Sequence, residues 1–127
     1  MSRITGINPS IYEPGQAITG RASAAVTAKR FLAISGNRTD GNVAVAPAAA
    51  AGRICGVAAH DAAVGELVRV LRGAGRVIRV TASGAIAAFA EVQVAAGGMA
   101  ATKAAGVAVG YVLTAAADGA DAEVSLY

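Results

Sequence analysis

One histidine stands beside a carboxylate, which is the pairing in this sequence with the most potential for catalysis. His60 is the single histidine, and Asp61 follows it directly. A base oriented by an acid is half of a hydrolytic constellation. Neighbouring residues of a strand point to opposite faces, so the pair would be poorly aimed unless it lies in a turn. Because alanines flank the pair on both sides, we interpret it as part of a surface turn.

The other residues with chemical potential are isolated. Cys55 is the single cysteine, so it forms no intrachain disulfide, and we expect a buried small thiol rather than a nucleophile. Residues 73–75 (GAG) begin like a dinucleotide-binding fingerprint, but the third glycine is missing and no helix pattern follows. Asp118, Asp121 and Glu123 lack the further ligands and the central glycine of a calcium loop. We therefore expect no catalytic residue, no cofactor and no metal.

Four arginines form the densest group of charges. They are Arg69, Arg72, Arg76 and Arg79. On paired strands they would form a cationic strip of the kind that binds nucleic acid phosphate. However, residues 65–87 contain no aromatic residue, whereas single-strand binders usually stack bases on aromatic side chains beside the basic groove. We favour a solvated or interface-facing strip and expect no nucleic acid partner, although nucleic acid stays the alternative for this strip.

Composition predicts one soluble domain with a thin core. A chain of 127 residues suits a single domain. Ala is the commonest residue in its hydrophobic content of 55%, with no Trp, two Phe and three Tyr, so each buried position removes little apolar area from water. We therefore expect burial between subunits or on a larger surface. Residues 1–10 lack the apolar run of a signal peptide, and no stretch matches a membrane span, so we expect synthesis in the cytoplasm and no membrane partner.

The charge is unevenly distributed along the chain. Residues 1–79 carry ten basic and four acidic side chains, whereas residues 80–127 carry one Lys and four acids. Such polarity orients a molecule on a charged partner more than it tightens the binding.

Short apolar runs between turn signals predict an all-β fold, a small barrel-like or sandwich domain over residues 28–127. Asp40-Gly41 predicts a tight turn between strands at 31–35 and 42–46. Residues 72–75 (RGAG) predict a second hairpin. Alanine-rich pieces are too short for more than one helical turn. The strands expected beyond the first two cover residues 66–71, 76–81, 89–94 and 122–126.

An internal repeat is visible at an offset of 54 residues. Residues 52–57 (GRICGV) align with residues 106–111 (GVAVGY), and the register continues to Val70 and Val124. Two related strand-turn-strand units could close a barrel-like sheet and remove exposed edges. Matches among small residues also arise by chance in a chain this rich in Ala and Gly, so both interpretations stay open.

Residues 1–27 predict an extended N-terminal arm. They carry Pro and Gly among scattered apolar residues, with no sustained period of 2 or 3.6. The apolar residues are unusual for a plain disordered tail, so we expect an arm that becomes ordered on a partner. Its candidate contact residues are Arg3, Ile4, Ile7, Ile11, Tyr12 and Ile18.

Two long runs cover much of the chain: GVAAHDAAVGELVRVLRGAGRVIRVTASGAIAA, from Gly56, and VGYVLTAAADGADAEVSL near the end. These runs resemble the phage capsid cement proteins, particularly those of phages and prophages of actinobacteria. The likeness covers about residues 30–127 and includes the Gly-Glu-x-Val-x-Val strand and the closing Gly-x-x-Leu-Thr-Ala-Ala. Where relatives commonly have Gly after Ala-Ile-Ala-Ala, this sequence has Phe89. Either the turn differs there, or Phe89 packs at a subunit contact.

The resemblance implies a head decoration protein that binds the outside of the expanded capsid and is not an enzyme. Its expected partners are the major capsid protein and its own copies, commonly as a homotrimer at three-fold and quasi-three-fold positions. The arm residues named above and the four arginines are then the candidate capsid-binding residues. A phage tail or baseplate component is the alternative of another class. A trimeric β-fold nucleotide hydrolase is a third, which the lack of paired carboxylates in a motif disfavours.

Overall fold

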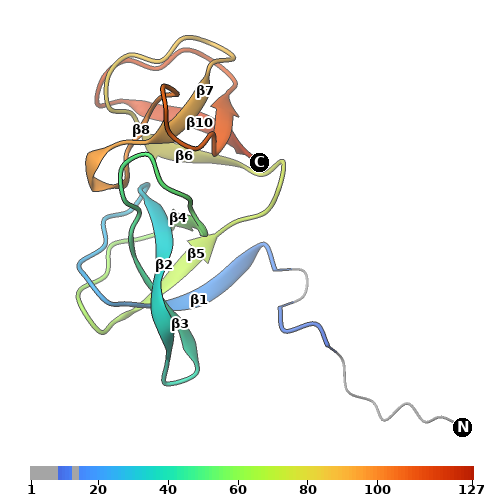
Figure 1. The fold of residues 1–127 in the computed structure, drawn as a ribbon, viewed down its shortest axis with the longest axis vertical. Coiled ribbons are helices and arrows are strands. Elements are labelled where there is room, and N and C mark those ends of the chain that lie inside the picture. The colour runs from blue at the N-terminus through green and yellow to red at the C-terminus, as the bar shows by residue number, and fades with distance from the viewer. Residues whose placement is uncertain (1–8, 13–14) are drawn as a thin grey trace, which may run out of the picture.

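The chain folds into a closed β-barrel and a second five-stranded sheet, which lie one above the other along its longest axis (Figure 1). Because one bridge brings the edges of the second sheet together, we call it the second barrel. The computed structural model describes residues 9–12 and 15–127. The first barrel contains β1 (Ala17–Ala22), β2 (Phe31–Thr39), β3 (Asn42–Pro47), β4 (Gly56–Ala58) and β5 (Leu67–Leu71). The second contains β6 (Val77–Thr81), β7 (Glu91–Val94), β8 (Ala100–Thr102), β9 (Gly110–Val112) and β10 (Asp121–Leu126). The predicted all-β class is confirmed, and a single 3₁₀ turn, η1 (Ala96–Gly98), is the one helical element of the described residues.

Both barrels have the same strand order. The first is closed, in the order β1-β3-β2-β4-β5, with β1 antiparallel to β5 and parallel to β3. The second sheet has the order β6-β10-β9-β7-β8. A parallel bridge between Ala82 and Ala100 brings its two edges together. Read in the opposite direction from β6, the second ring is β6-β8-β7-β9-β10. Each of β6 to β10 therefore occupies the place of the corresponding strand among β1 to β5.

The internal repeat corresponds to the two barrels, with five strands in each copy. The expectation that the two repeated units close one sheet together is wrong, because they lie in different barrels. Gly56 and Gly110, which align in the sequence, begin β4 and β9. A Cβ on Gly56 would lie 2.5 Å from the carbonyl oxygen of Leu71, and one on Gly110 would meet the carbonyl oxygen of Ser125 even closer. Only glycine permits this approach of the neighbouring strand. The same steric requirement at the same place in both barrels argues against chance similarity.

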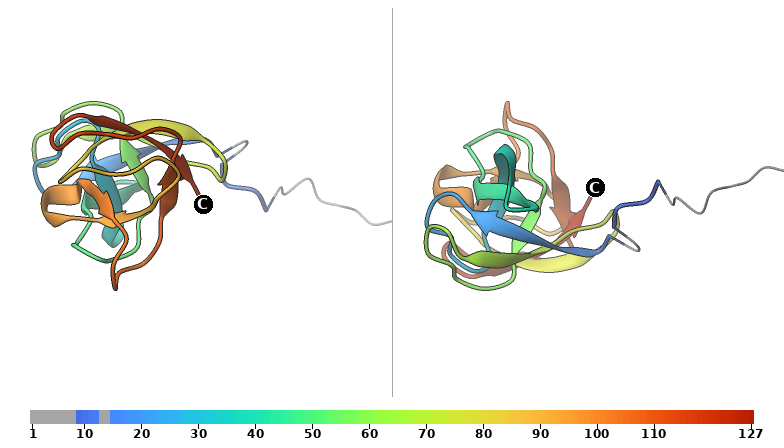
Figure 2. Two further views of the ribbon diagram at one scale, coloured as in Figure 1. Left: turned by 90° about the horizontal axis from the view of Figure 1, so that it is seen from above. Right: turned by 90° about the horizontal axis from the view of Figure 1, so that it is seen from below.

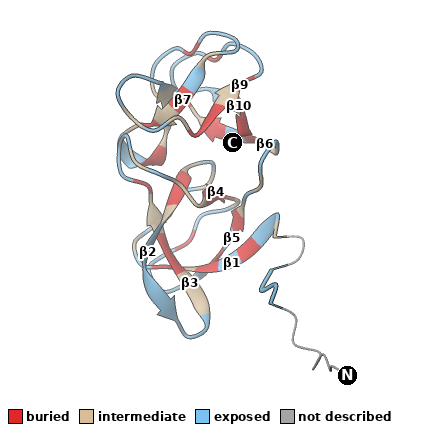
Figure 3. Cartoon of the chain, turned by 45° about the vertical axis from the view of Figure 1, so that its right-hand side comes forward, coloured by how far each residue is buried: buried red, intermediate tan, exposed pale blue. Residues whose placement is uncertain are grey.

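The core is made mainly of Val and Ala, as the composition predicted. Buried and exposed residues alternate along β5 and β6, and Figure 3 shows buried stretches on strands of both barrels. Phe31 and Val57, from the first barrel, belong to the apolar cluster of the second barrel rather than to that of their own. One apolar cluster therefore extends across the junction of the barrels, and the first barrel has a second cluster of its own.

One of the two predicted hairpins forms and the other does not. Asp40 and Gly41 have positive φ values and connect β2 to β3, which pair antiparallel. The expected pairing of residues 66–71 with 76–81 is wrong, because β5 pairs with β1 and β4, whereas β6 pairs with β10. The glycine-rich turn at 72–75 exists, with the amide of Arg76 donating to the carbonyl of Gly73. It carries the chain from one barrel to the next instead of folding it back.

The expected arm is shorter than residues 1–27. Residues 17–22 form β1 in the first barrel, and Val26 bridges to Ala62. The alternation of an inward and an outward face is present in β1, but two of its inward residues are Gly20 and Ala22, so it is nearly invisible in the sequence. Residues 9–12 lie to one side of the two barrels when the molecule is viewed along its long axis (Figure 2).

Candidate functional site

The structure gathers several of the predicted contact residues on one surface beside the turn between the barrels. Ile11, Tyr12, Arg69 and Arg76 line the same hollow. Arg76 also lines, together with Arg79, a groove of about 650 Å³ between the barrels. Arg72 borders a further hollow that includes Tyr12. We call this the arm-arginine surface, made of Ile11, Tyr12, Arg69, Arg72, Arg76 and Arg79.

Backbone geometry positions these arginines. Arg69 lies on the outward face of β5 opposite Thr19, and Arg79 lies on the outward face of β6 opposite Glu123. Arg76 is half-buried and donates a hydrogen bond to the carbonyl of Gln16. Within the described residues, none of the four guanidinium groups has a carboxylate within 4.0 Å. Their charge is therefore free to attract an acidic partner.

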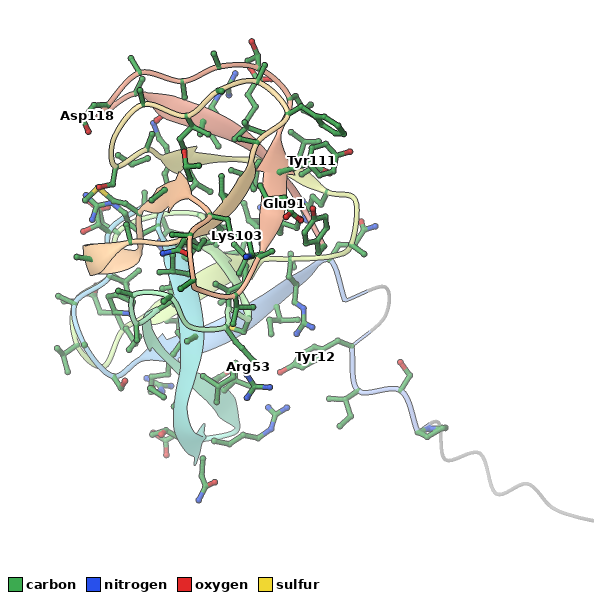
Figure 4. The ribbon with its side chains drawn as sticks, turned by 45° about the horizontal axis from the view of Figure 1, so that its top comes forward. Tyr12, Arg53, Glu91, Lys103, Tyr111 and Asp118 are labelled. Carbon is green, nitrogen blue, oxygen red and sulfur yellow. The ribbon has the colours of Figure 1, made fainter. Side chains whose placement is uncertain are left out.

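Tyr12 contacts a residue that sequence reasoning missed. Its ring lies 5.7 Å from the guanidinium of Arg38, which also donates to the Tyr12 hydroxyl at 3.2 Å. Arg38 comes from the long β2–β3 hairpin, so nothing in the sequence near Tyr12 signals this contact. Figure 4 shows Tyr12 on the segment that leads from β1 toward the N-terminus.

The other predicted contact residues are Ile18 and three residues near the N-terminus. Ile18 is only 4% exposed and packs in the core of the first barrel, although it also borders the hollow of Tyr12 and Arg72. Its place in β1 corrects the expectation that it belongs to an extended arm. Arg3, Ile4 and Ile7 lie outside the described residues.

The His60-Asp61 pair has a structural role. Nδ1 of His60 lies 2.9 Å from the carbonyl oxygen of Asp61, and Nε2 accepts the amide N–H of Arg69 at 3.2 Å. The Asp61 carboxylate accepts the amide N–H of Ala28 at 2.8 Å. Both ring nitrogens and the carboxylate are therefore occupied by backbone groups, in an exposed bend as the sequence predicted.

The remaining chemical candidates are also separate from one another. Burial raises the pKa of the half-buried Cys55 thiol, although the nearby Arg72 lowers it in part. Asp118 accepts the amide N–H of Gly84, while Asp121 forms an ion pair with Lys29 at 3.0 Å. In the part of the chain that the structure describes, no three His, Cys, Asp or Glu side chains come together as metal ligands would. No helix there is long and apolar enough to cross a membrane.

A second exposed feature is an aromatic cluster on the second barrel. Phe89 meets Tyr111 edge to face with ring centroids 5.4 Å apart, and Tyr111 lies 6.1 Å from Tyr127. The Tyr127 hydroxyl donates to the Glu91 carboxylate at 2.6 Å, and this bond raises the pKa of Tyr127. Figure 4 shows Tyr111 and Glu91 close together. We call Phe89, Tyr111, Leu113 and Tyr127 the aromatic face.

The turn at Phe89 keeps the conformation that a glycine would favour. Phe89 has a φ of 65°, and Lys29, at the corresponding place in the first barrel, has a φ of 60°. The amide of Lys29 donates to Ala58 and that of Phe89 to Val112, so the two turns have the same hydrogen bond. Phe89 thus adopts a turn conformation that suits the glycine of relatives, and a subunit contact stays as the other explanation of this aromatic residue.

Comparisons with known proteins agree with this architecture. A solved structure described as "The crystal structure of head fiber gp8.5 N base in bacteriophage phi29" is similar, with a TM-score of 0.75. It is 24% identical over 87% of this chain and 92% of its own, which shows a shared fold. The search of curated proteins found no match. The model of the phage cement protein family matches residues 12–126, from Tyr12 through the last strand of the second barrel. The chain therefore belongs to the phage cement protein family.

Proposed function

We propose that this chain is a structural virion protein that binds the outer surface of an expanded phage capsid and stabilises it, with no chemistry of its own. The observation that carries the proposal is the match of the cement family across both barrels and into the arm. Its partners are the major capsid protein and its own copies, as a homotrimer at three-fold and quasi-three-fold positions. The protein is made in the cytoplasm of an actinobacterial host. Neither nucleic acid nor a membrane is its partner.

The arm-arginine surface is the candidate contact with the capsid. It combines exposed apolar groups, Ile11 and Tyr12, with arginines that lack carboxylate partners among the described residues. Apolar contacts supply affinity, and unpaired surface charge raises the rate of encounter with an acidic patch. The arm adds reach, because a segment that orders on binding wraps a wide surface at an entropic cost.

Preferential binding is sufficient for stabilisation. A ligand that binds the assembled shell but not its separated subunits stabilises the shell by RT ln(1 + [L]/Kd) per site, which is ~2.7 kcal/mol at ~100-fold saturation. Many sites on one lattice multiply this contribution.

Attachment to undecorated expanded heads, followed by pelleting and electron microscopy, tests the proposal. The double variant Arg69→Ser/Arg72→Ser should attach more slowly than the wild type, and its rate should depend less on salt. Arg53→Ser/Lys103→Ser is the matched control, because it removes the same charge from exposed side chains elsewhere. Equal slowing by both pairs would contradict a specific arginine contact, and lack of attachment by the wild type would contradict the function.

A tail or baseplate component is the second candidate. It shares a small β fold and the lack of paired catalytic groups. Immunolabelling of virions distinguishes the two, since decoration places the label over the whole head and a tail part does not. A nucleotide panel tests the enzymatic alternative, for which we expect no turnover.

A further inference from the structure

The junction within the chain shows how one barrel packs on another barrel with the same strand order. The outward side of β2 and β4 in the first barrel is covered by the second barrel, which buries Phe31 and Val57. The amide of Thr81 donates to the carbonyl of Lys29 at 3.0 Å, and Arg30 donates to the carbonyl of Gly97 at 3.1 Å. The Lys29–Asp121 ion pair closes the contact at its edge.

The contact is head-to-tail: the first barrel contributes its receiving side, and the second barrel contributes its covering side. The covering side of the first barrel and the receiving side of the second take no part in it. The receiving side of the first barrel corresponds in the second barrel to the aromatic face, whose Phe89 and Leu113 stay exposed among the residues that the structure describes. Lys29 corresponds to Phe89, which is 78% exposed, and Ala59 corresponds to Leu113, which is 50% exposed. The correspondence rests on matched hydrogen bonds: Ala59 N–H donates to Arg69, and Leu113 N–H donates to Glu123, at the same place in each barrel.

The covering side of the second barrel has an unused counterpart in the first barrel. Asp121 begins β10 and pairs with Thr81, and Leu67 begins β5 and pairs with Arg21. Leu67 is therefore the counterpart of Asp121, and it is 48% exposed. The ion pair of the internal junction, Lys29 with Asp121, has as its counterpart two exposed apolar side chains, Phe89 and Leu67.

The conformation of Phe89 is a separate indication of a contact outside the chain. Its φ of 65° is a region that a bulky side chain rarely occupies. A large exposed aromatic residue in such a conformation contributes little to the core of its own chain. A bulky residue in a strained conformation at a surface points to a role in binding.

We infer that the aromatic face of one copy receives the first barrel of a second copy, with Leu67 against Phe89. Each of these exposed apolar groups then covers the other, as the two halves of the ion pair do at the internal junction. At the internal junction, the edge of β6 is open, so that the amide of Thr81 bonds to Lys29. At the counterpart of Thr81 in the first barrel, which is Arg21, β3 already lies beside β1. The contact between copies therefore depends on side chains. Head-to-tail contacts of this kind either close into a ring or grow into a filament. The inference deepens the homotrimer of the proposed function, and it is tested without capsids, so that its failure is distinguishable from a failure of capsid binding.

The experiment is sedimentation of the free protein over a concentration series. The wild type should self-associate, and Phe89→Gly and Leu67→Asp should each raise the concentration needed by at least ~10-fold, as loss of a central apolar contact does. Phe89→Gly relieves the backbone strain of the turn, so we expect this variant to fold. Ile11→Ser is the control, because it removes an equally exposed aliphatic side chain of the arm and should leave self-association unchanged.

Two further samples test the pairing and its direction. The double variant Phe89→Lys/Leu67→Asp rebuilds the Lys29–Asp121 pair between copies and should recover association that each single change loses. A mixture of Phe89→Gly with Leu67→Asp retains one intact pair of faces, so it should form a dimer of one chain of each kind and nothing larger. A wild type that sediments as a single chain at every concentration, unchanged association in Phe89→Gly, or failure of the mixed dimer would each overturn the inference.

Discussion

Replacing Gly56 or Gly110 by alanine tests the packing that defines both barrels. A Cβ at Gly56 would lie 2.5 Å from the main-chain oxygen of Leu71 and 2.6 Å from Cγ1 of Val70. The main-chain oxygen belongs to the neighbouring strand, so it cannot rotate away as a flexible side chain would. Overpacking of a well-packed site usually costs ~1–3 kcal/mol, and the rigid neighbour places this one at the upper end. We expect each substitution to destabilise the fold by ~3 kcal/mol, which lowers Tm by on the order of 10 °C in a chain of this size.

Thermal or urea unfolding measures the effect, with Gly36→Ala as the matched control. Gly36 is also a strand glycine, but a Cβ there meets nothing within 4 Å and its φ is not positive. Its substitution should change stability by less than ~0.5 kcal/mol, as at an ordinary surface position. Because the two barrels repeat the same close approach, Gly56→Ala and Gly110→Ala should cost similar amounts. If either costs no more than Gly36→Ala, the close approach of the strands is wrong.

Three further predictions concern single side chains. Phe89→Ala should be less stable than Phe89→Gly by ~1 kcal/mol in urea unfolding, because alanine keeps the positive φ that glycine relieves, and the usual order, with alanine more stable, would contradict this. Alkylation of Cys55 near neutral pH should be slower in the folded protein than in urea, because burial raises the pKa of the thiol and so lowers its thiolate fraction. The rate in the folded protein should also begin to rise at a higher pH than the rate in the unfolded chain. Equal rates would contradict burial. Glu91→Gln should lower the pKa of Tyr127, since the carboxylate that holds its proton is gone, and an unchanged ultraviolet titration would show that the hydrogen bond does not form.

The sequence predicted the class of fold because its strands carry alternation and its turns carry glycine or aspartate. Asp40-Gly41 is an example, since both residues adopt the positive φ that this turn requires. The repeat was visible at Gly56 and Gly110 because a steric requirement preserved glycine in both copies. Strands whose inward residues are small, such as β1, carry no such signal.

The error at the second hairpin has a different cause, which is that strand partners are chosen by tertiary structure. The turn at 72–75 has the residues of a hairpin, yet β5 already has two neighbours in a closed barrel. It therefore has no free edge for β6. For the same reason, the contact of Arg38 with Tyr12 could not be read from either segment alone. The residues of the arm-arginine surface could be named from the sequence, because this surface requires only that the four arginines lie near the N-terminal segment.

The central claim is that this chain stabilises a capsid by binding it, and the survival of heads tests that claim most directly. Expanded heads saturated with the protein are heated beside bare heads, and intact particles are counted by electron microscopy. The proposed function predicts that decorated heads survive to a higher temperature. Equal survival at full occupancy would contradict stabilisation and would leave the chain as a surface component without a cement role.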